Sequence, residues 1–331
     1  MIISRTPLRM SLVGGGSDLP AFYKSEEVGA VISSAIDKYI YVNVNKKFDQ
    51  GIRVGYSINE EVTAVDQIKH PLVRESMRYL GLNGGVEITT IADIPSKGTG
   101  LGSSSSFTVG LLHALNAYMG KYSSAEVLGK DACKVEIELC KEPIGKQDQY
   151  AAAYGGFNLI EFRPDESVVV SPLICKAATI KSLQSSLLMF YTGTTRNASS
   201  ILQEQSDSLA NNPVKLQALR QMVKLAYSLR DELQANNLEA MGEILHENWL
   251  LKKSLVASIS NQEIDRWYEL AMNAGAQGGK ILGAGAGGFL LMTAPPEKHT
   301  AIKAALSMLK HVPVELEPLG SRIVFDTARS E

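Results

Sequence analysis

The segment 95–106, which reads Pro-Ser-Lys-Gly-Thr-Gly-Leu-Gly-Ser-Ser-Ser-Ser, constrains the fold of this 331-residue chain more than any other feature. Its three glycines stand at alternate positions, where the missing Cβ lets the backbone turn tightly and approach a ligand. The residues that follow, 107–118, have apolar side chains at helical spacing. A glycine-rich turn before a helix directs free N–H groups and the positive end of the helix dipole towards one point. The sequence therefore predicts an anion site, most simply a phosphate-binding loop.

This loop matches neither of the two common phosphate-binding patterns. The Walker pattern requires a lysine after its last glycine, and Ser103 stands there. The dinucleotide pattern requires a third glycine at the same position. The alternative of an exposed Gly/Ser linker is disfavoured, because linkers are not followed by a long amphipathic helix.

The composition excludes several classes of protein. Apolar residues make up 45% and charged residues 21%, and the net charge of -2 without a basic block argues against a nucleic-acid partner. No apolar run approaches the length of a membrane span, so we expect no membrane partner. Three cysteines are too few for a disulfide framework, and the N-terminal residues lack the arrangement of a signal peptide. We therefore expect a cytoplasmic protein.

The length suggests two domains, and we place them at residues 1–180 and 181–331. We expect residues 2–13 to form a strand broken by Pro7, and residues 123–141 to form one helix that ends before Pro143. In the second domain we expect a strand, three long helices, a shorter helix and two closing strands, at about 186–191, 213–234, 238–255, 261–274, 296–310, 312–317 and 322–326.

Two further glycine-rich segments flank this arrangement. Gly14–Asp18 follows the first strand and suits a tight turn or a close ligand. Asp18 either binds sugar hydroxyls or caps the short segment 19–23, and the sequence leaves both open. In 280–288, three glycines match the dinucleotide pattern, but a short apolar run that reads as a strand follows them. We therefore predict two strands joined by a glycine turn.

Together the segments Pro7–Asp18, Pro95–Ser106 and Lys280–Gly288 resemble, in order, the three motifs of the GHMP kinase superfamily, named for galactokinase, homoserine kinase, mevalonate kinase and phosphomevalonate kinase. The resemblance covers essentially the whole chain. It implies an α+β fold of two domains: an N-terminal ribosomal-protein-like α/β domain and a C-terminal ferredoxin-like α+β domain. It also implies ATP and Mg²⁺ as cofactors.

The resemblance implies roles for individual residues. Asp148 falls on the catalytic aspartate and Arg9 on its basic partner. Ser104 and Glu136 fall on the magnesium ligands, with Glu138 as the alternative to Glu136. ATP would bind to the second motif, at Lys97, Gly98, Thr99, Gly100, Leu101, Gly102, Ser103, Ser104 and Ser105.

The chemistry of phosphoryl transfer suits these roles. The reaction needs positioned groups and neutralised charge more than covalent catalysis. One hydroxyl and one carboxylate suffice for Mg²⁺, which keeps several waters, and a carboxylate beside the acceptor hydroxyl can take its proton. The competing structural interpretations are a surface strand charge for Arg9, a helix cap for Asp148 and a solvated helix face for Glu136.

The residues within and next to the motifs narrow the choice of substrate. Segments 145–154 and 191–199 resemble D-glycero-D-manno-heptose 7-phosphate kinases, which make heptose 1,7-bisphosphate for the nucleotide-activated heptose of surface polysaccharides such as capsule or lipopolysaccharide. A fucokinase-like or other sugar 1-kinase is the alternative. Arg196 and Lys97 are the candidate cations for a substrate phosphate. The predicted substrate-binding residues are Gly15, Gly16, Ser17, Asp18, Thr194, Arg196 and Gly285.

Three rival functions follow from the same residues. A nicotinamide-dependent oxidoreductase would use Gly283–Gly288, a non-catalytic homologue would only bind a sugar phosphate, and an ATP-dependent decarboxylase would release CO₂. The strand expected after the glycines disfavours the oxidoreductase, because the dinucleotide pattern needs a helix there. The intact Ser104, Asp148 and Arg9 disfavour a non-catalytic homologue. The polar turn 14–18 disfavours the decarboxylase. Whether the chain forms a homodimer is left open.

Overall fold

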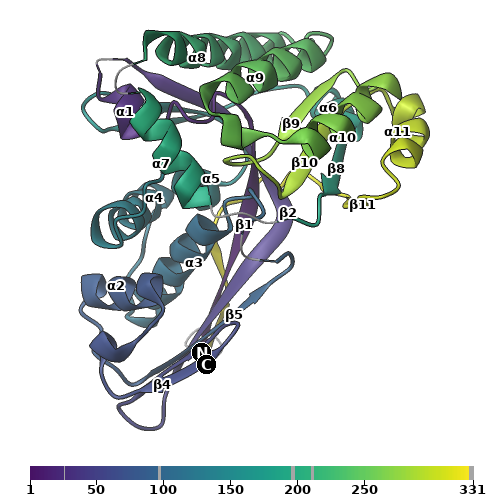
Figure 1. Ribbon diagram of the computed structural model, residues 1–331. Helices are drawn as coiled ribbons and strands as arrows, with labels where there is room; N and C mark the ends of the chain where they lie inside the picture. Colours follow the sequence, from purple (N-terminus) through teal and green to yellow (C-terminus); the bar gives the residue numbers. More distant parts are fainter. Residues whose placement is uncertain (26, 96–97, 195–197, 210–211, 328–331) are drawn as a thin grey trace.

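The computed structural model describes residues 1–25, 27–95, 98–194, 198–209 and 212–327, which form two sheets with helices packed around them (Figure 1). The larger sheet has eight strands in the order β12-β1-β2-β5-β3-β4, with β6 and then β7 continuing from β2. Its strands are β1 (Ile2–Val13), β2 (Gly29–Lys46), β3 (Ile52–Gly55), β4 (Asn59–Val62), β5 (Val86–Ala92), β6 (Phe157–Phe162), β7 (Val168–Pro172) and β12 (Arg322–Asp326). The smaller sheet has the order β11-β8-β10-β9, from β8 (Leu187–Tyr191), β9 (Gly278–Ile281), β10 (Phe289–Thr293) and β11 (Lys310–His311).

The α-helices lie over both sheets. They are α1 (Pro20–Tyr23), α2 (Pro71–Leu80), α3 (Ser103–Tyr118), α4 (Ala125–Cys133), α5 (Gln147–Tyr154), α6 (Ala177–Ser186), α7 (Ala198–Leu209), α8 (Pro213–Gln234), α9 (Met241–Leu255), α10 (Gln262–Asn273) and α11 (His299–Ala305). Within the part of the chain that the structure describes, no helix has the length and apolar character needed to cross a membrane.

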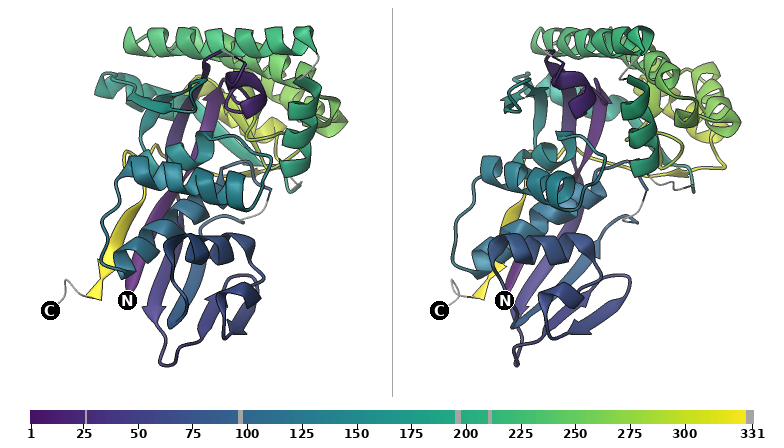
Figure 2. Two further views of the ribbon diagram at one scale, coloured as in Figure 1. Left: turned by 90° about the vertical axis from the view of Figure 1, so that its left-hand side faces the viewer. Right: turned by 60° about the vertical axis from the view of Figure 1, so that its left-hand side comes forward.

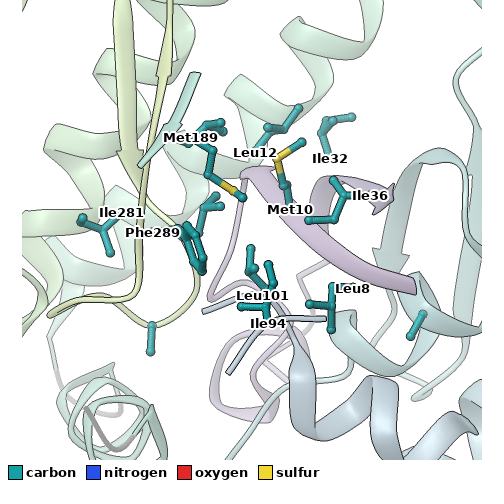
Figure 3. Packing of buried hydrophobic residues seen from close by; sticks show 14 of the residues in the cluster. Leu8, Met10, Leu12, Ile32, Ile36, Ile94, Leu101, Met189, Ile281 and Phe289 are labelled. Carbon is teal, nitrogen blue, oxygen red and sulfur yellow. The ribbon is translucent and has the colours of Figure 1, made fainter. Parts of the chain in front are cut away.

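Strands β1 and β2 form a long antiparallel pair, and helices from both halves of the chain pack on this pair (Figure 1). Leu8, Met10 and Leu12 of β1 are buried, as their alternation predicts. They meet core residues of both halves, including Leu101 and Phe289 (Figure 3). The expected break at Pro7 is wrong: β1 continues through it, and the register with β2 only shifts between Pro7 and Leu8.

The last strand belongs to the first sheet, not to the second domain as the sequence suggested. Strand β12 pairs antiparallel with β1, with Ile2 opposite Asp326, and the two ends of the described chain lie close together (Figure 2). The Met1 amino group donates to Thr327 Oγ1 at 2.7 Å. The sequence identified the strand 322–326 correctly, but a local pattern does not say which sheet a strand joins. The expected strand 312–317 is reduced to a single bridge between Ile36 and Leu316.

The three long helices of the second half are confirmed as α8, α9 and α10, while the last expected helix is shorter, as α11. The expected helix 123–141 is wrong in its second part. The α-helical form ends at Cys133, and Lys134–Leu139 forms a π-helical turn. Helices α6 and α7 have no counterpart in the sequence-based assignment, and the boundary at residue 180 stays a prediction.

The predicted glycine turn between two strands is confirmed by the antiparallel pair β9 and β10. This turn packs backbone against backbone on the loop before α3. A Cβ added to Gly100, whose φ is +75°, would lie 2.2 Å from the Leu282 carbonyl oxygen. A Cβ added to Gly288 would lie 2.3 Å from the Thr99 carbonyl oxygen. The two segments can touch only because neither carries side chains at these points.

This contact predicts the effect of Gly100→Ala. The variant should lower the midpoint of thermal unfolding by more than Gly120→Ala does, because Gly120 has a similar φ of +73° but nothing within 4 Å of an added Cβ. Gly120→Ala therefore measures the cost of a positive φ alone, about 1 kcal/mol. Equal midpoints for the two variants would contradict a packing role for Gly100.

Candidate active site

A cavity of about 720 Å³ opens where the three glycine-rich segments meet. Its walls come from β1, the turn 14–18, the loop 98–102 with the first turn of α3, the segment 142–148, helices α7 and α9, and Gly283–Ala284. Segments from both ends of the chain thus form one concave site, as binding sites commonly are. The predicted residues Lys97 and Arg196 lie outside the described residues.

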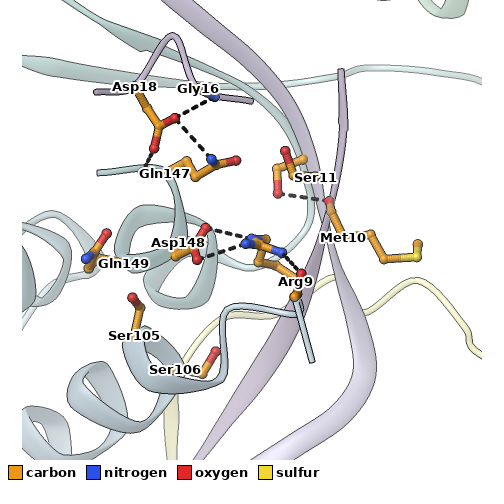
Figure 4. Close-up of polar contacts among 12 residues, drawn as sticks. Arg9, Met10, Ser11, Gly16, Asp18, Ser105, Ser106, Gln147, Asp148 and Gln149 are labelled. Atoms are coloured by element: carbon orange, nitrogen blue, oxygen red, sulfur yellow. Dashed lines mark hydrogen bonds and ion pairs between the residues drawn. The ribbon is translucent and has the colours of Figure 1, made fainter. Parts of the chain in front are cut away.

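Arg9 and Asp148 form a bidentate ion pair inside this cavity (Figure 4). Arg9 Nε donates to Asp148 Oδ1 at 2.7 Å, and its Nη2 donates to Oδ2 at 2.8 Å. The Arg9 side chain is 3% exposed and that of Asp148 is 25% exposed, so the carboxylate faces the cavity and the guanidinium lies behind it. Arg9 is therefore not a surface charge. Asp148 does not cap α5 either, since the N-cap is Lys146 and no side chain caps it.

The same arginine joins the ion pair to the predicted phosphate loop. Arg9 Nη1 donates to the Gly100 carbonyl oxygen at 2.7 Å, and the Arg9 backbone N–H donates to the buried Leu101 carbonyl at 3.0 Å. A Cβ added to Gly102 would lie 3.3 Å from Asp148 Oδ2. The loop therefore passes directly over the ion pair, and glycine suits position 102 both by this close approach and by its φ of +72°.

Helix α3 begins at Ser103, directly after this loop, with Gly102 as its N-cap at φ +72°. Its first amides have no partner within the helix, and the helix dipole adds positive potential at the same end. The side chains of Ser103, Ser104 and Ser105 line the cavity together with Gly98, Thr99 and Gly100. The loop and the start of the helix thus have the geometry that an anion site requires, and the binding of ATP here stays a prediction.

Glu136 lies beneath the first turn of α3, where it is fully buried. Ser104 Oγ donates to Glu136 Oε1 at 2.9 Å, and Ser105 Oγ donates to Oε2 at 2.7 Å. Gln149 Nε2 donates to the same Oε2 at 2.6 Å. Burial raises the pKa of Glu136 to about 7, although the three donors oppose this shift. The interpretation that Glu136 lies on a solvated helix face is therefore wrong, whereas Glu138 is exposed.

Asp18 is buried in the turn after β1, and its carboxylate accepts three hydrogen bonds. Oδ1 accepts from the Gly16 N–H at 3.0 Å and from Gln147 Nε2 at 3.1 Å, while Oδ2 accepts from the Gln147 N–H at 3.2 Å. Burial, and next the negative charge of Asp148, raise the pKa of Asp18. The capping alternative is wrong, because the N-cap of α1 is Leu19 and receives no side-chain bond. Asp18 instead connects this turn to the residue before Asp148.

The structure brings Gly15, Gly16 and Asp18 to the cavity wall but places three other predicted substrate residues elsewhere. Ser17 is buried, and its Oγ donates to the Gly14 carbonyl at 2.8 Å, so it supports the turn. The Thr194 carbonyl accepts from the Gly288 N–H at 2.8 Å. A Cβ added to Gly285 would lie 2.6 Å from the Ile259 carbonyl oxygen. All three residues lie close to the site without lining it.

Several cavity residues were missed by reading the sequence. They include Ser11 of β1, Glu142, Gln147, Ser199 and Leu202 of α7, and Lys252 of α9. One signal was available for Lys252. It follows Leu245 and Trp249 at helical spacing, and both of these are fully buried. A lysine on the apolar stripe of a helix is unusual enough to mark a functional position.

Comparison with known proteins agrees with this arrangement. Residues 68–156 match the N-terminal domain of GHMP kinases, and residues 229–313 match their C-terminal domain. The D-glycero-alpha-D-manno-heptose 7-phosphate kinase of Campylobacter jejuni is 32% identical in an alignment of 329 positions that covers 92% of each chain.

Solved structures show the same fold. A D-glycero-D-manno-heptose 1-phosphate kinase from Bacteroides thetaiotaomicron superimposes with a TM-score of 0.80 at 24% identity, over 98% of this chain and 99% of that one. A putative sugar kinase from Campylobacter jejuni superimposes with a TM-score of 0.76 at 27% identity, over 97% of both chains. The predicted two-domain α+β fold is confirmed, and the chain belongs to the GHMP kinases, as an ATP-dependent phosphotransferase with an alcohol acceptor.

Proposed function

We propose that this enzyme transfers the γ-phosphoryl group of ATP to the anomeric hydroxyl of D-glycero-D-manno-heptose 7-phosphate. The product, heptose 1,7-bisphosphate, would serve the synthesis of nucleotide-activated heptose. The observation that carries the chemistry is the Asp148 carboxylate, held by Arg9 at the cavity wall directly beneath the phosphate loop. The choice of sugar is supported by the relative that is 32% identical over 92% of both chains.

The polyphosphate of ATP fits the loop 98–102 and the first turn of α3. Backbone amides and the dipole of α3 would stabilise its negative charge, and the Ser103 hydroxyl on the same helical turn could supply a further donor. Phosphoryl transfer gains most of its rate from such fixed positive potential around the equatorial oxygens. Lys97, on the same segment of sequence, is proposed as an additional cation.

Ser104 and Glu136 would hold Mg²⁺, and their atoms suit it. Both offer hard oxygen ligands, and Ser104 Oγ and Glu136 Oε1 are already 2.9 Å apart. Among the described residues no group of three or more His, Cys, Asp or Glu could hold a metal, so phosphate oxygens and water would complete the coordination. When bound there, Mg²⁺ would neutralise charge on the triphosphate and favour the ionised form of Glu136.

Asp148 would accept the proton of the acceptor hydroxyl. Each of its oxygens accepts one bond from Arg9, which leaves a second lone pair on each oxygen for the substrate. As the hydroxyl oxygen forms its bond to the γ-phosphorus and the bond to ADP breaks, the proton moves to Asp148. Arg9 keeps the carboxylate in position and adds positive charge near the attacking oxygen. We place this reaction in the cytoplasm, where ATP is available.

A coupled ADP-release assay tests the choice of substrate. The panel is heptose 7-phosphate, mannose 6-phosphate, sedoheptulose 7-phosphate, fucose and galactose. We expect the highest kcat/KM for heptose 7-phosphate and transfer to its anomeric oxygen, which phosphorus NMR of the product identifies. Preference for fucose or galactose would refute the substrate while leaving the kinase chemistry intact.

Asp148→Asn tests the proton acceptor. The amide keeps the shape of the side chain but is a far weaker base, so kcat should fall on the order of 10²-fold or more, with the KM for ATP nearly unchanged. Asp231→Asn is the matched control, because Asp231 is 63% exposed and pairs only with its neighbour Arg230 among the described residues. A kcat for Asp148→Asn within tenfold of the wild type, in folded protein, would mean that Asp148 only orients the acceptor.

Glu136→Gln tests the magnesium site against its alternative. Removing the charge should raise the Mg²⁺ concentration required for half-maximal activity by about tenfold. Glu138→Gln is the control: Glu138 is exposed, two positions along the chain, and should have no effect. If the two variants respond in the reverse order, Glu138 is the ligand.

A further inference from the structure

The region around Gly15 and Gly16 contains polar atoms that the proposed chemistry does not use. Within the described residues, Ser11 Oγ and Gln147 Oε1 are buried without a hydrogen-bond partner, and both residues line the cavity. Gln205 Nε2, which also lacks a partner, lies behind this wall, 2.4 Å from the position of a Cβ on Gly16. Ser11 Oγ lies 3.2 Å from the position of a Cβ on Gly15. Buried polar atoms in folded proteins are nearly always paired, so these atoms indicate a place where a polar ligand completes the structure.

Lys252 of α9 places a positive charge at the same wall. Its side chain is 3% exposed and lines the cavity. Nζ donates to the Gly15 carbonyl at 3.2 Å and to Gln205 Oε1 at 3.0 Å, both of them neutral acceptors. Among the described residues no carboxylate lies within ion-pair distance of Lys252. Asp18 is the negative group whose charge reaches it.

The ammonium group has capacity for a further ligand. It carries three N–H donors, and two of them are used by Gly15 and Gln205. A Cβ added to Gly16 would lie 2.4 Å from Gln205 Nε2 and 3.3 Å from Lys252 Nζ, so glycine at this position leaves room for both groups. A buried charge that lacks an ionised partner is costly, and an anion arriving with the substrate would supply that partner.

We propose that Lys252 binds the phosphate that the acceptor sugar already carries, with Gln205 as the positioning residue that holds its ammonium group. This inference rests on the proposed function, in which the acceptor is a sugar phosphate. Asp148 from the first half of the chain would then engage the reacting hydroxyl, and Lys252 from the second half the distal phosphate. Binding the acceptor would thus need both halves of the chain.

A second buried lysine shows what a purely structural role looks like. Lys280 of β9 donates to the backbone carbonyls of Ser11 and Leu12, at 2.9 and 3.2 Å. It is buried to the same degree as Lys252 but does not line the cavity. Both lysines connect the two halves of the chain, whereas only Lys252 can also reach a ligand.

The test is a thermodynamic cycle in which one step removes the charge of Lys252 and the other removes the phosphate group of the sugar. Calorimetry measures the Kd of the wild type and of Lys252→Met for heptose 7-phosphate and for the unphosphorylated heptose. We expect Lys252→Met to raise the Kd and KM for the phosphorylated sugar by roughly ten- to a hundredfold. Its Kd for the neutral sugar, and its KM for ATP, should stay within about twofold of the wild type.

Two further variants serve as a control and as a replacement for Lys252→Met. Lys253→Met is the matched control on the same helix, because Lys253 pairs with Asp265 at 2.9 Å and does not line the cavity. Lys252→Gln retains a donor for the Gly15 carbonyl while removing the charge, so it replaces Lys252→Met if thermal unfolding shows that the methionine variant is not folded. We expect it to discriminate between the two sugars in the same way.

Each other outcome has a definite meaning. Equal losses of affinity for the two sugars, or no loss for either, would show that Lys252 is structural and overturn the inference. If the assay panel identifies another sugar phosphate as the acceptor, the proposed substrate is wrong, and the same cycle with that acceptor and its neutral form decides the role of Lys252. A preference for neutral sugars in the panel would overturn both the proposed substrate and the role of Lys252 in binding its phosphate.

Discussion

The buried ion pair between Arg9 and Asp148 holds the site together. Arg9 lies on the central strand β1 and donates twice to the aspartate on α5 and once to the Gly100 carbonyl. Its position therefore fixes the distance between the Asp148 carboxylate and the loop 98–102. A planar guanidinium suits this task because its donors are rigidly arranged, and a lysine could reach only one of these partners at a time. The rest of the fold supports this arrangement: β2 pairs along β1, and α3 and α5 pack on it.

The glycine-rich segments do more than bind ligands, because they also join the two halves of the chain. The loop before α3 touches the turn between β9 and β10 through backbone atoms alone, at Gly100 and Gly288. The turn after β1 receives Lys252 from α9 in a similar way, through the Gly15 carbonyl. Contacts between backbones have little freedom to adjust, so the two halves are held in a fixed arrangement around the cavity.

The glycine-rich loop and the helix after the serines could be predicted from sequence, because a glycine pattern before a helical run of apolar residues reports local geometry. The roles of Arg9 and Asp148 came from the resemblance to GHMP kinases, since the two residues are far apart in the sequence and no local pattern joins them. The inward direction of Glu136 follows from its position one helical turn after the buried Ala132, whereas the π-helical form of 134–139 has no signal in the sequence. The pairing of β12 with β1 and the approach of Lys252 to Gly15 are contacts between residues far apart in sequence, and no local pattern encodes them.

The pairing of β12 with β1 has a consequence for how the protein is made. Strand β1 emerges from the ribosome well before β12, yet the two are neighbours in one sheet. The edge of β1 that pairs with β12, from Ile2 to Arg5, must therefore stay unpaired until β12 has been made, exposed to other nascent strands. The larger sheet is completed only when this late strand joins it.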